Sequence, residues 1–455
     1  MPAGRRARAA PPGDAPAHAG APVEDGQNEA PGLGVRLREG LARVKSSRFA
    51  RDSAMLLMMN LLSRAVSFVA SAYALRCLGP YNVGVSGLIQ VTSQQVSLGY
   101  HGGFDTPAVR RIAADCARAG DITRTVVGFR GVLSLLAALV WVLVVLAAPE
   151  MTHRSAWLWG APLLLISAGN VGFVFNAVER LPVQTAIGTG GTLLAAAAYL
   201  LLFRPGMPLG SDLAVMVGVG VLTTVFSWVA YRRMFGEWPV GGAAPGRLGP
   251  LLRESWRFWA LAVAVFLYST FQIPLIAHYL GAHQTGLYRS AFTMAAAVEL
   301  LYNSINSLLL PRLVKWRSAG AGVLWRRQGQ LFAVFSAIGA AVTLVLAAAA
   351  PTIFALALGP AFVPAVPVFQ VLLVGRLVVF LGQIYTFGLA AAGLDNSFLG
   401  VSVLGAVLSI TLNVLLLPHF GLYGAAAVSV GVELVISLFS YFALRRHVRA
   451  ALAGA

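Results

Sequence analysis

Residues 214–233, AVMVGVGVLTTVFSWVAYRR, align without gaps to residues 427–446, AVSVGVELVISLFSYFALRR, at an offset of 213 positions. Each copy is an apolar stretch of about 20 residues, the helix length that crosses a hydrocarbon core, and each ends in two arginines. Further upstream, Leu78-Gly79 with Gly84 matches Leu280-Gly281 with Gly286 at an offset of 202 positions. The chain therefore repeats itself, and each repeat ends in a membrane-spanning helix.

The composition supports a membrane protein over the whole length. Of the 455 residues, 58% are hydrophobic and only 11% are charged, whereas a soluble protein carries roughly 25% charged residues. Only a helix or a closed barrel satisfies its backbone in hydrocarbon, and the apolar stretches are too long for barrel strands. The predicted spans are 54–78, 83–104, 127–148, 156–178, 184–203, 213–231, 258–280, 286–309, 329–349, 364–388, 398–417 and 422–444.

The predicted fold class is an all-α polytopic membrane protein, with about 12 transmembrane helices in two parallel six-helix repeats around a central cavity. Six helices is an even number, so both repeats enter the membrane in the same direction. The predicted parts are a cytoplasmic tail (1–50), an N-terminal lobe (51–233), a linker (234–252), a C-terminal lobe (253–446) and a C-terminal tail (447–455).

The positive charges predict the orientation. Of the 34 Lys and Arg residues, 27 fall in the N-terminal tail, in alternate loops and at the C-terminal end. Positive loops stay in the cytoplasm, so both termini are predicted to be cytoplasmic in a bacterial inner membrane. This explains the net charge of +17 without a nucleic-acid partner.

Reporter fusions test this orientation. Reporters fused after Arg118 and Gly246 are expected to report the cytoplasm, and a reporter after Met207 the periplasm, because positive charge is retained inside. A periplasmic signal at Gly246 would overturn the arrangement of six plus six helices.

The N-terminal tail has a different composition from the spans. Residues 1–50 are rich in Pro, Ala and Gly and begin without an apolar period, which predicts a disordered basic tail. Within it, residues 33–50 have an apolar face opposed by Arg and Lys, which favours a basic helix on the anionic inner leaflet. A solvated linker is the alternative.

Several motifs resemble one known family. LGPYNVGVSGL (78–88), its echo LGAHQTGLYRSAF (280–292), PRLVKW (311–316), AAGLDNSF (391–398) and LLLPHFGLYGAAAVSV (415–430) are similar to the Wzx-type polysaccharide and O-antigen flippases. These belong to the superfamily of multidrug, oligosaccharidyl-lipid and polysaccharide exporters. The resemblance covers residues 50–446. It implies passage of an undecaprenyl-pyrophosphate-linked oligosaccharide across the inner membrane, with a polysaccharide polymerase and a chain-length regulator as partners.

Arg64 is the predicted contact for the pyrophosphate. It lies about ten residues into the first span, roughly 15 Å deep by helical rise, where charges are costly and usually mark function. Asn60 and Ser67 share its face at helical spacing, and a guanidinium suits phosphate oxygens. Arg64 and Asn60 are therefore predicted to bind substrate. A structural arginine paired with a carboxylate or carbonyl is the alternative.

Other polar residues within the spans complete the predicted site. Gln90 and Gln94 form a second polar stripe that suits sugar hydroxyls, with interhelical hydrogen bonding as the alternative. Arg289, near a span end, would otherwise snorkel to the interface. Glu299 and Glu433 are candidates for coupling to an ion gradient, and for each of them a salt bridge to Arg376 or Arg64 is the alternative, which is favoured for Glu433. The substrate-binding residues predicted in the second half are Gln272, Arg289, Glu299, Asn303, Arg376 and Gln383.

The sequence disfavours three functions other than that of a polysaccharide flippase. A cation-coupled drug exporter of the same superfamily typically carries a carboxylate within its first bundle, whereas Asp52, Asp105, Glu179 and Asp212 lie at span edges. A membrane-embedded polysaccharide polymerase or ligase needs an acid or base on the outer side, where the predicted loops are short and nearly uncharged. The related peptidoglycan precursor flippase typically has two extra C-terminal helices. No catalytic residue, metal site or cofactor is predicted.

Overall fold

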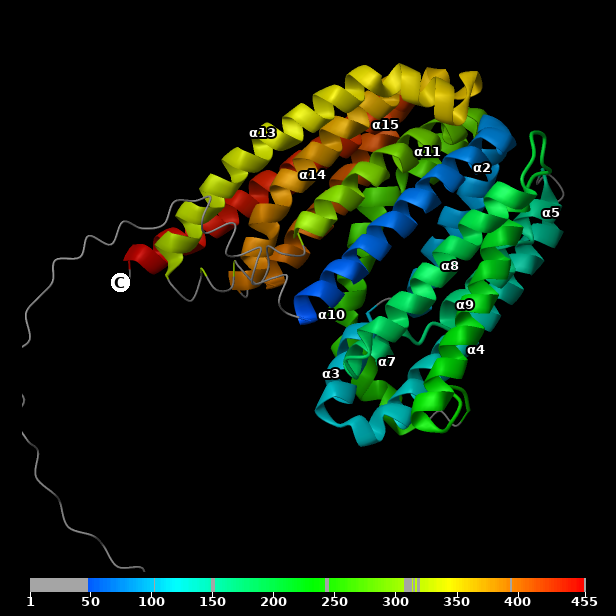
Figure 1. Cartoon of the computed structure of the whole chain (residues 1–455), viewed down its shortest axis with the longest axis vertical. Helices are drawn as coiled ribbons and strands as arrows, with labels where there is room; N and C mark the ends of the chain where they lie inside the picture. The colour runs from blue at the N-terminus through cyan, green and yellow to red at the C-terminus, as the bar shows by residue number, and fades with distance from the viewer. Residues whose placement is uncertain are drawn as a thin grey trace, which may run out of the picture. The chain divides into compact units, whose positions relative to one another are not determined.

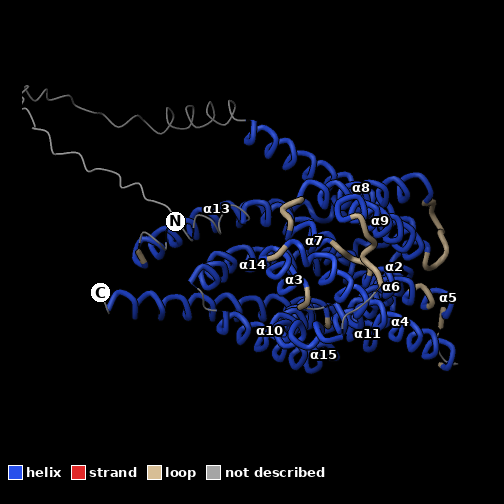
Figure 2. Tube along the Cα trace, turned by 90° about the horizontal axis from the view of Figure 1, so that it is seen from below, coloured by secondary structure: helices blue, strands red, loops and turns tan. Residues whose placement is uncertain are grey.

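The computed structural model describes residues 48–101, 103–148, 152–241, 245–306, 313, 316, 320–392 and 395–453. Over these ranges every regular element is a helix (Figure 2). The chain divides into two compact units, Met1–Met59 and Asn60–Ala455. The described residues of the first unit, 48–59, are helical. Most of the predicted tail, residues 1–47, lies outside the described residues.

The helices follow one another along the chain in the order shown by their colours in Figure 1. The first half contains α2 (Arg48–His101), α3 (Asp105–Ala114), η1 (Cys116–Arg118), α4 (Ala119–Ala147), α5 (Arg154–Trp157), α6 (Gly160–Ala168), α7 (Gly172–Ala177), α8 (Leu181–Leu202) and α9 (Ser211–Phe235). The second half contains α10 (Pro245–Thr270), α11 (Gln272–Asn306), α13 (Ala321–Ile353), η2 (Phe354–Leu358), η3 (Pro360–Ala365), α14 (Val366–Ala392) and α15 (Asp395–Ala453).

Within the described residues, eight helical segments are long and apolar enough to cross a membrane. Large apolar side chains are exposed along them, among them Leu136 on α4, Leu201 on α8 and Leu344 on α13. A surface that faces lipid tolerates these side chains because the surrounding hydrocarbon is equally apolar. The prediction of an all-α polytopic membrane protein is confirmed. The number of twelve spans and the central cavity stay predictions.

Glycine kinks join several consecutive spans. The loops expected after residues 78 and 280 are each reduced to one residue, Gly79 (φ 75°, ψ 164°) and Gly281 (φ 81°, ψ 176°), after which the helix resumes. Glycine adopts a positive φ at no steric cost. Since both glycines have nearly the same backbone angles, the repeat seen in the sequence is also present in the local structure. A third kink lies at Gly421 in α15.

The predicted span 156–178 corresponds to a stretch that is long and apolar enough to cross a membrane, Arg154–Ala177, but it is not one continuous helix. It consists of α5, α6 and α7, which are separated near residues 158 and 170. The carbonyl freed at Gly169 accepts a hydrogen bond from Trp228 Nε1 at 2.8 Å, and Asn170 Oδ1 accepts one from Gly172 N at 2.8 Å. A broken helix is tolerated inside a membrane where such partners satisfy its backbone.

The two halves meet at the repeated glycines of α2 and α11, which lie side by side in Figure 1. A Cβ placed on Gly84 would overlap the carbonyl oxygen of Ala282, and one placed on Gly286 would overlap the carbonyl oxygen of Pro80. Pro80 and Ala282 are themselves equivalent at the offset of 202. The contact is therefore reciprocal, as expected for two copies related by a two-fold axis.

The helix α10 contacts both halves. Leu251 is buried in a core cluster of the first half, and a Cβ on Gly103 would lie 2.6 Å from the carbonyl oxygen of Ser255. Arg111 Nη2 is 2.7 Å from Glu254 Oε1. Further along, α10 packs against α15. The predicted linker 234–252 is thus helical from Pro245 onward, and the predicted lobe boundaries stay predictions.

Candidate functional site

Arg289 on α11 is a charged side chain that the structure places between the two halves. Its Nη2 donates a hydrogen bond to Oε1 of Gln90 on α2, and its Cζ lies 2.9 Å from the position of a Cβ on Gly87. Its Nη1 is buried and has no hydrogen-bond partner among the described residues. Two predicted site residues, Gln90 and Arg289, are therefore brought together. The alternative in which Arg289 snorkels to the interface does not hold, because the side chain is directed at α2.

Asp212, at the start of α9, extends this arrangement. Ser86 Oγ donates a hydrogen bond to Asp212 Oδ1 at 2.7 Å. Asp212 also interacts electrostatically with Arg289. The sequence places Asp212 at the edge of a span, and none of its neighbours in the sequence indicates a contact with the other half of the chain. We refer to Ser86, Gln90, Asp212 and Arg289 as the interlobe cluster.

A second polar region lies inside the second half. A cavity of about 40 Å³ is lined by Arg376, Glu433, Phe292 and Ser429, among others. The guanidinium of Arg376 lies 4.7 Å from the centre of the Phe292 ring. This volume has room for only a few water molecules, so the cavity is too small for a sugar. It brings Arg376 and Glu433 to one place, as the salt-bridge alternative for Glu433 requires.

Gln272 is buried beside this cavity. Its Nε2 donates hydrogen bonds to the carbonyl oxygen of Ser269 at 2.9 Å and to the hydroxyl of Tyr288 at 3.3 Å. That hydroxyl is also 3.3 Å from Ser429 Oγ. In this conformation Gln272 therefore connects α10, α11 and α15, and its predicted contact with substrate stays a prediction.

Three other predicted residues have described side chains outside the contacts of the interlobe cluster and of the cavity. The Arg64 and Gln94 side chains on α2 are exposed, and Gln383 on α14 is partly buried. Arg64 makes no hydrogen bond or ion pair with any side chain that the structure describes, so a salt bridge from Glu433 to Arg64 is absent from this part of the chain. The side chains of Asn60, Glu299 and Asn303 lie outside the described ones.

Arg130 is a fully buried arginine with a structural role. Its Nη2 lies 2.8 Å from Asp105 Oδ1 and donates to the carbonyl oxygen of His101 at 3.0 Å. The guanidinium carbon of Arg130 lies 5.9 Å from the centre of the Phe104 ring and 5.7 Å from the centre of the Phe173 ring. Arg130 therefore ties the end of α2 to the start of α3.

Solved structures of similar fold are transporters. The chain is similar to an inward-facing multidrug resistance MATE family transporter of the MOP superfamily, with a TM-score of 0.68 at 14% identity over 86% of this chain and 96% of that one. It is equally similar to the lipid II flippase MurJ in an inward closed conformation, with a TM-score of 0.68 at 9% identity over 86% and 87%. An outward-facing MATE structure gives a TM-score of 0.55 at 14% identity over 87% and 94%. The chain has the two-lobe fold of these proteins.

Sequence comparisons give the family. The chain is 23% identical over 386 residues to a protein of Escherichia coli (strain K12) named "Putative O-antigen transporter", which covers 81% of this chain and 90% of that one. The model of the family described as "Polysaccharide biosynthesis protein" matches residues 49–316, more than half of the chain. This chain is a member of the polysaccharide biosynthesis protein family.

Proposed function

We propose that this protein moves an undecaprenyl-pyrophosphate-linked oligosaccharide across the bacterial inner membrane for polysaccharide biosynthesis, by alternating access of its two lobes. Membership of the family and similarity to an E. coli protein named as an O-antigen transporter support the substrate class. The fold supports alternating access, because solved structures of this fold include both inward-facing and outward-facing conformations.

The interlobe position of Arg289 is the observation that carries the proposal. A half-buried arginine whose Nη1 is buried and unused by the described residues favours an anionic partner over a cationic drug. It lies where the two halves touch, so it can respond to their separation. A pyrophosphate carries at least two negative charges and needs such cations to offset its desolvation inside the membrane.

The positions of Arg64 and Arg289 suggest an order of events. Arg64 is exposed on the first span and meets the pyrophosphate first. Arg289 lies beyond it, near the contact of Gly84 with Gly286. When the phosphate reaches Arg289, it competes with Gln90 and Asp212 for the guanidinium. Loss of those contacts weakens the interface between α2 and α11 and favours opening at this end.

We extend the proposal to the coupling of transport to an ion gradient and to the proteins that receive the substrate. Glu299 and Glu433 are the coupling candidates of the second half, and both termini face the cytoplasm. The emerging repeat unit passes to a polysaccharide polymerase and a chain-length regulator. We assign the protein no catalytic step and no cofactor.

Replacing Arg64 by alanine tests the function. We expect Arg64→Ala to abolish export and to leave lipid-linked repeat units on the inner side, because the desolvated pyrophosphate loses its first cation. Arg64→Lys keeps the charge without the bidentate fork and is expected to retain partial activity. The measurement is surface glycan and inner-leaflet repeat units in cells with equal membrane levels of each variant.

The matched control is Arg204→Ala, an exposed arginine that donates to the carbonyl oxygen of the adjacent Phe203 and lies in a predicted outer loop. It should export normally. Normal export by Arg64→Ala would show that the first phosphate contact lies elsewhere. Repeat units that reach the outer leaflet at the same rate without the protein would refute the function.

A further inference from the structure

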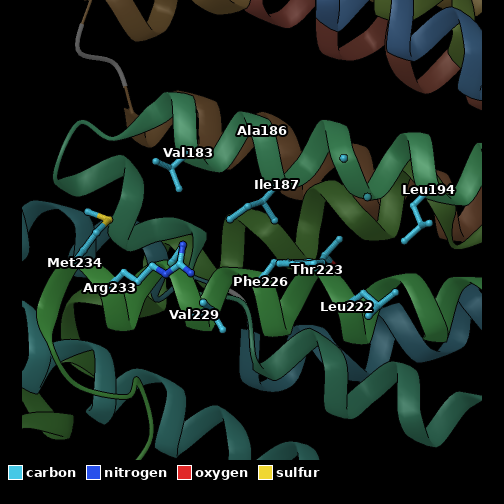
Figure 3. A pocket seen from close by; sticks show the side chains of 13 residues that line it. Val183, Ala186, Ile187, Leu194, Leu222, Thr223, Phe226, Val229, Arg233 and Met234 are labelled. Carbon is cyan, nitrogen blue, oxygen red and sulfur yellow. The ribbon is translucent and has the colours of Figure 1, made fainter.

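A groove runs between α8 and α9 in the first half of the chain (Figure 3). Its volume is about 750 Å³. Its lining is almost wholly apolar, with Ile187, Gly190 and Leu194 from α8 facing Leu222 and Phe226 from α9. Figure 3 shows Arg233 at one end of the groove, with its guanidinium directed between the two helices.

We propose that this groove binds one isoprenoid chain of a polyprenyl-pyrophosphate lipid, with the phosphates beside Arg233. The inference rests on the proposed function, because the occupant is the lipid carrier of the same substrate. It assigns a contact for the tail, separate from the arginines that meet the head group on its passage.

The charge at one end selects an anionic head group. Arg233 lies in the last turn of α9, and the antiparallel α8 begins nearby at Leu181. The start of a helix carries a partial positive charge that favours phosphate. Arg180, the residue before α8, is exposed at the same end. A cation and a helix start therefore converge at the mouth of an otherwise apolar groove.

The length of the groove fits a lipid held in one leaflet. From Val183 to Leu194, α8 rises about 16 Å at 1.5 Å per residue. That is roughly half of the ~30 Å hydrocarbon core. A chain with its phosphates at Arg233 would therefore run from the interface toward the middle of the bilayer. On the predicted orientation this is the cytoplasmic leaflet, where an uptake site for the carrier would be needed.

The internal repeat allows one position of the groove to be compared with its counterpart in the second half. At the offset of 213, Thr223 on α9 corresponds to Ile436 on α15. Ile436 is buried, packs with Val401 and Tyr268, and touches the position of a Cβ on Gly405. Thr223 likewise touches the position of a Cβ on Gly191 of α8, and it also lines the groove. The larger side chain of Ile436 occupies space that the smaller side chain of Thr223 leaves to the groove.

A single groove with a cation at one end suits a single-chain lipid. Phospholipids carry two acyl chains on one phosphate, and a polyprenyl carrier has one chain and a diphosphate. Inside a bilayer, burial of the chain gives little net gain, since surrounding lipid is as apolar as the groove. Selectivity must therefore come from the shape of the groove and from the pairing of phosphate with Arg233.

Cross-linking to the full-length protein in lipid nanodiscs tests the groove. With p-benzoylphenylalanine in place of Phe226, we expect capture of radiolabelled polyprenyl pyrophosphate that excess phosphatidylglycerol does not prevent. Gly190→Phe should lower the yield about tenfold, because the ring fills the space that the chain would take. Gly188→Phe is the matched control on the same helix. A Cβ on either glycine meets no atom within 4 Å, but Gly188 does not line the groove.

The charge is tested in the same assay. Arg233→Gln should weaken capture about tenfold, the loss expected for one charge-assisted hydrogen bond. Arg232→Gln should leave it unchanged, because the Arg232 guanidinium lies 4.6 Å from the Trp238 ring centre and outside the groove. Absence of capture, or its full prevention by phosphatidylglycerol, overturns the inference. If no lipid is captured but the wild-type protein exports the glycan, the proposed function stands and only the groove inference fails. If lipid is captured but cells that lack the protein export the glycan equally well, the proposed function fails.

Discussion

Arg289→Ala is expected to abolish export. The substitution removes the guanidinium that binds Gln90 and leaves Asp212 with Ser86 as its hydrogen-bond partner in the interlobe cluster. The loss of this guanidinium also leaves Asp212 without a nearby positive charge, so the membrane level of the variant should also fall. Arg289→Lys keeps the charge and should retain part of the activity. The measurements are surface glycan and protein level in membranes.

A double substitution separates stability from transport. Asp212→Asn combined with Arg289→Gln replaces both charges by neutral amides, so we expect the membrane level to recover. Export should stay absent, because the proposed contact with the pyrophosphate is still missing. Recovery of export in this double variant would show that Arg289 serves only to balance Asp212.

Gly286→Ala is the second substitution with a large expected effect. Its Cβ would overlap the carbonyl oxygen of Pro80, and backbone atoms cannot rotate out of the way as a flexible side chain can. Overpacking costs about 1–3 kcal/mol, and here the cost falls on the conformation in which the two halves touch. We expect export to fall roughly tenfold or more, measured at equal membrane levels.

The reciprocal variant and a control accompany it. Gly84→Ala should have the same effect, because its Cβ would overlap the carbonyl oxygen of Ala282. Gly99→Ala, also on α2, places a Cβ where no atom lies within 4 Å and should export normally. Equal activity of all three variants would mean that the halves do not need this close approach during transport.

Local sequence accounts for the features that repeat or that depend on apolar length. Long apolar stretches such as 127–148 predict helices in lipid, because hydrocarbon leaves the backbone no other partner. The matching Leu-Gly pairs at 78–79 and 280–281 predict equivalent turns, and Gly79 and Gly281 do have matching backbone angles. These features follow from neighbouring residues, so no knowledge of helix packing is needed to predict them.

The site depends on contacts between distant segments. Arg64 attracts attention because a charge within an apolar run is visible in the sequence. Asp212 does not, because it lies at a span edge, and only the crossing of α9 with α2 brings it to Ser86. Arg130 likewise looks like a residue of the membrane interface until the fold of α3 brings Asp105 to it.

The groove between α8 and α9 also depends partly on local sequence and partly on the packing of distant segments. The sequence repeat pairs Thr223 with Ile436, and both lie on apolar helices. How such a position is packed depends on which other helices lie beside it: Val401 and Tyr268 pack with Ile436, whereas Thr223 contacts the position of a Cβ on Gly191 and lines the groove. The composition of a segment determines whether it enters the membrane, because the free energies of transferring its side chains from water to hydrocarbon add up along the segment. The neighbours of each face depend on how separate segments pack, and so they appear only in the folded chain.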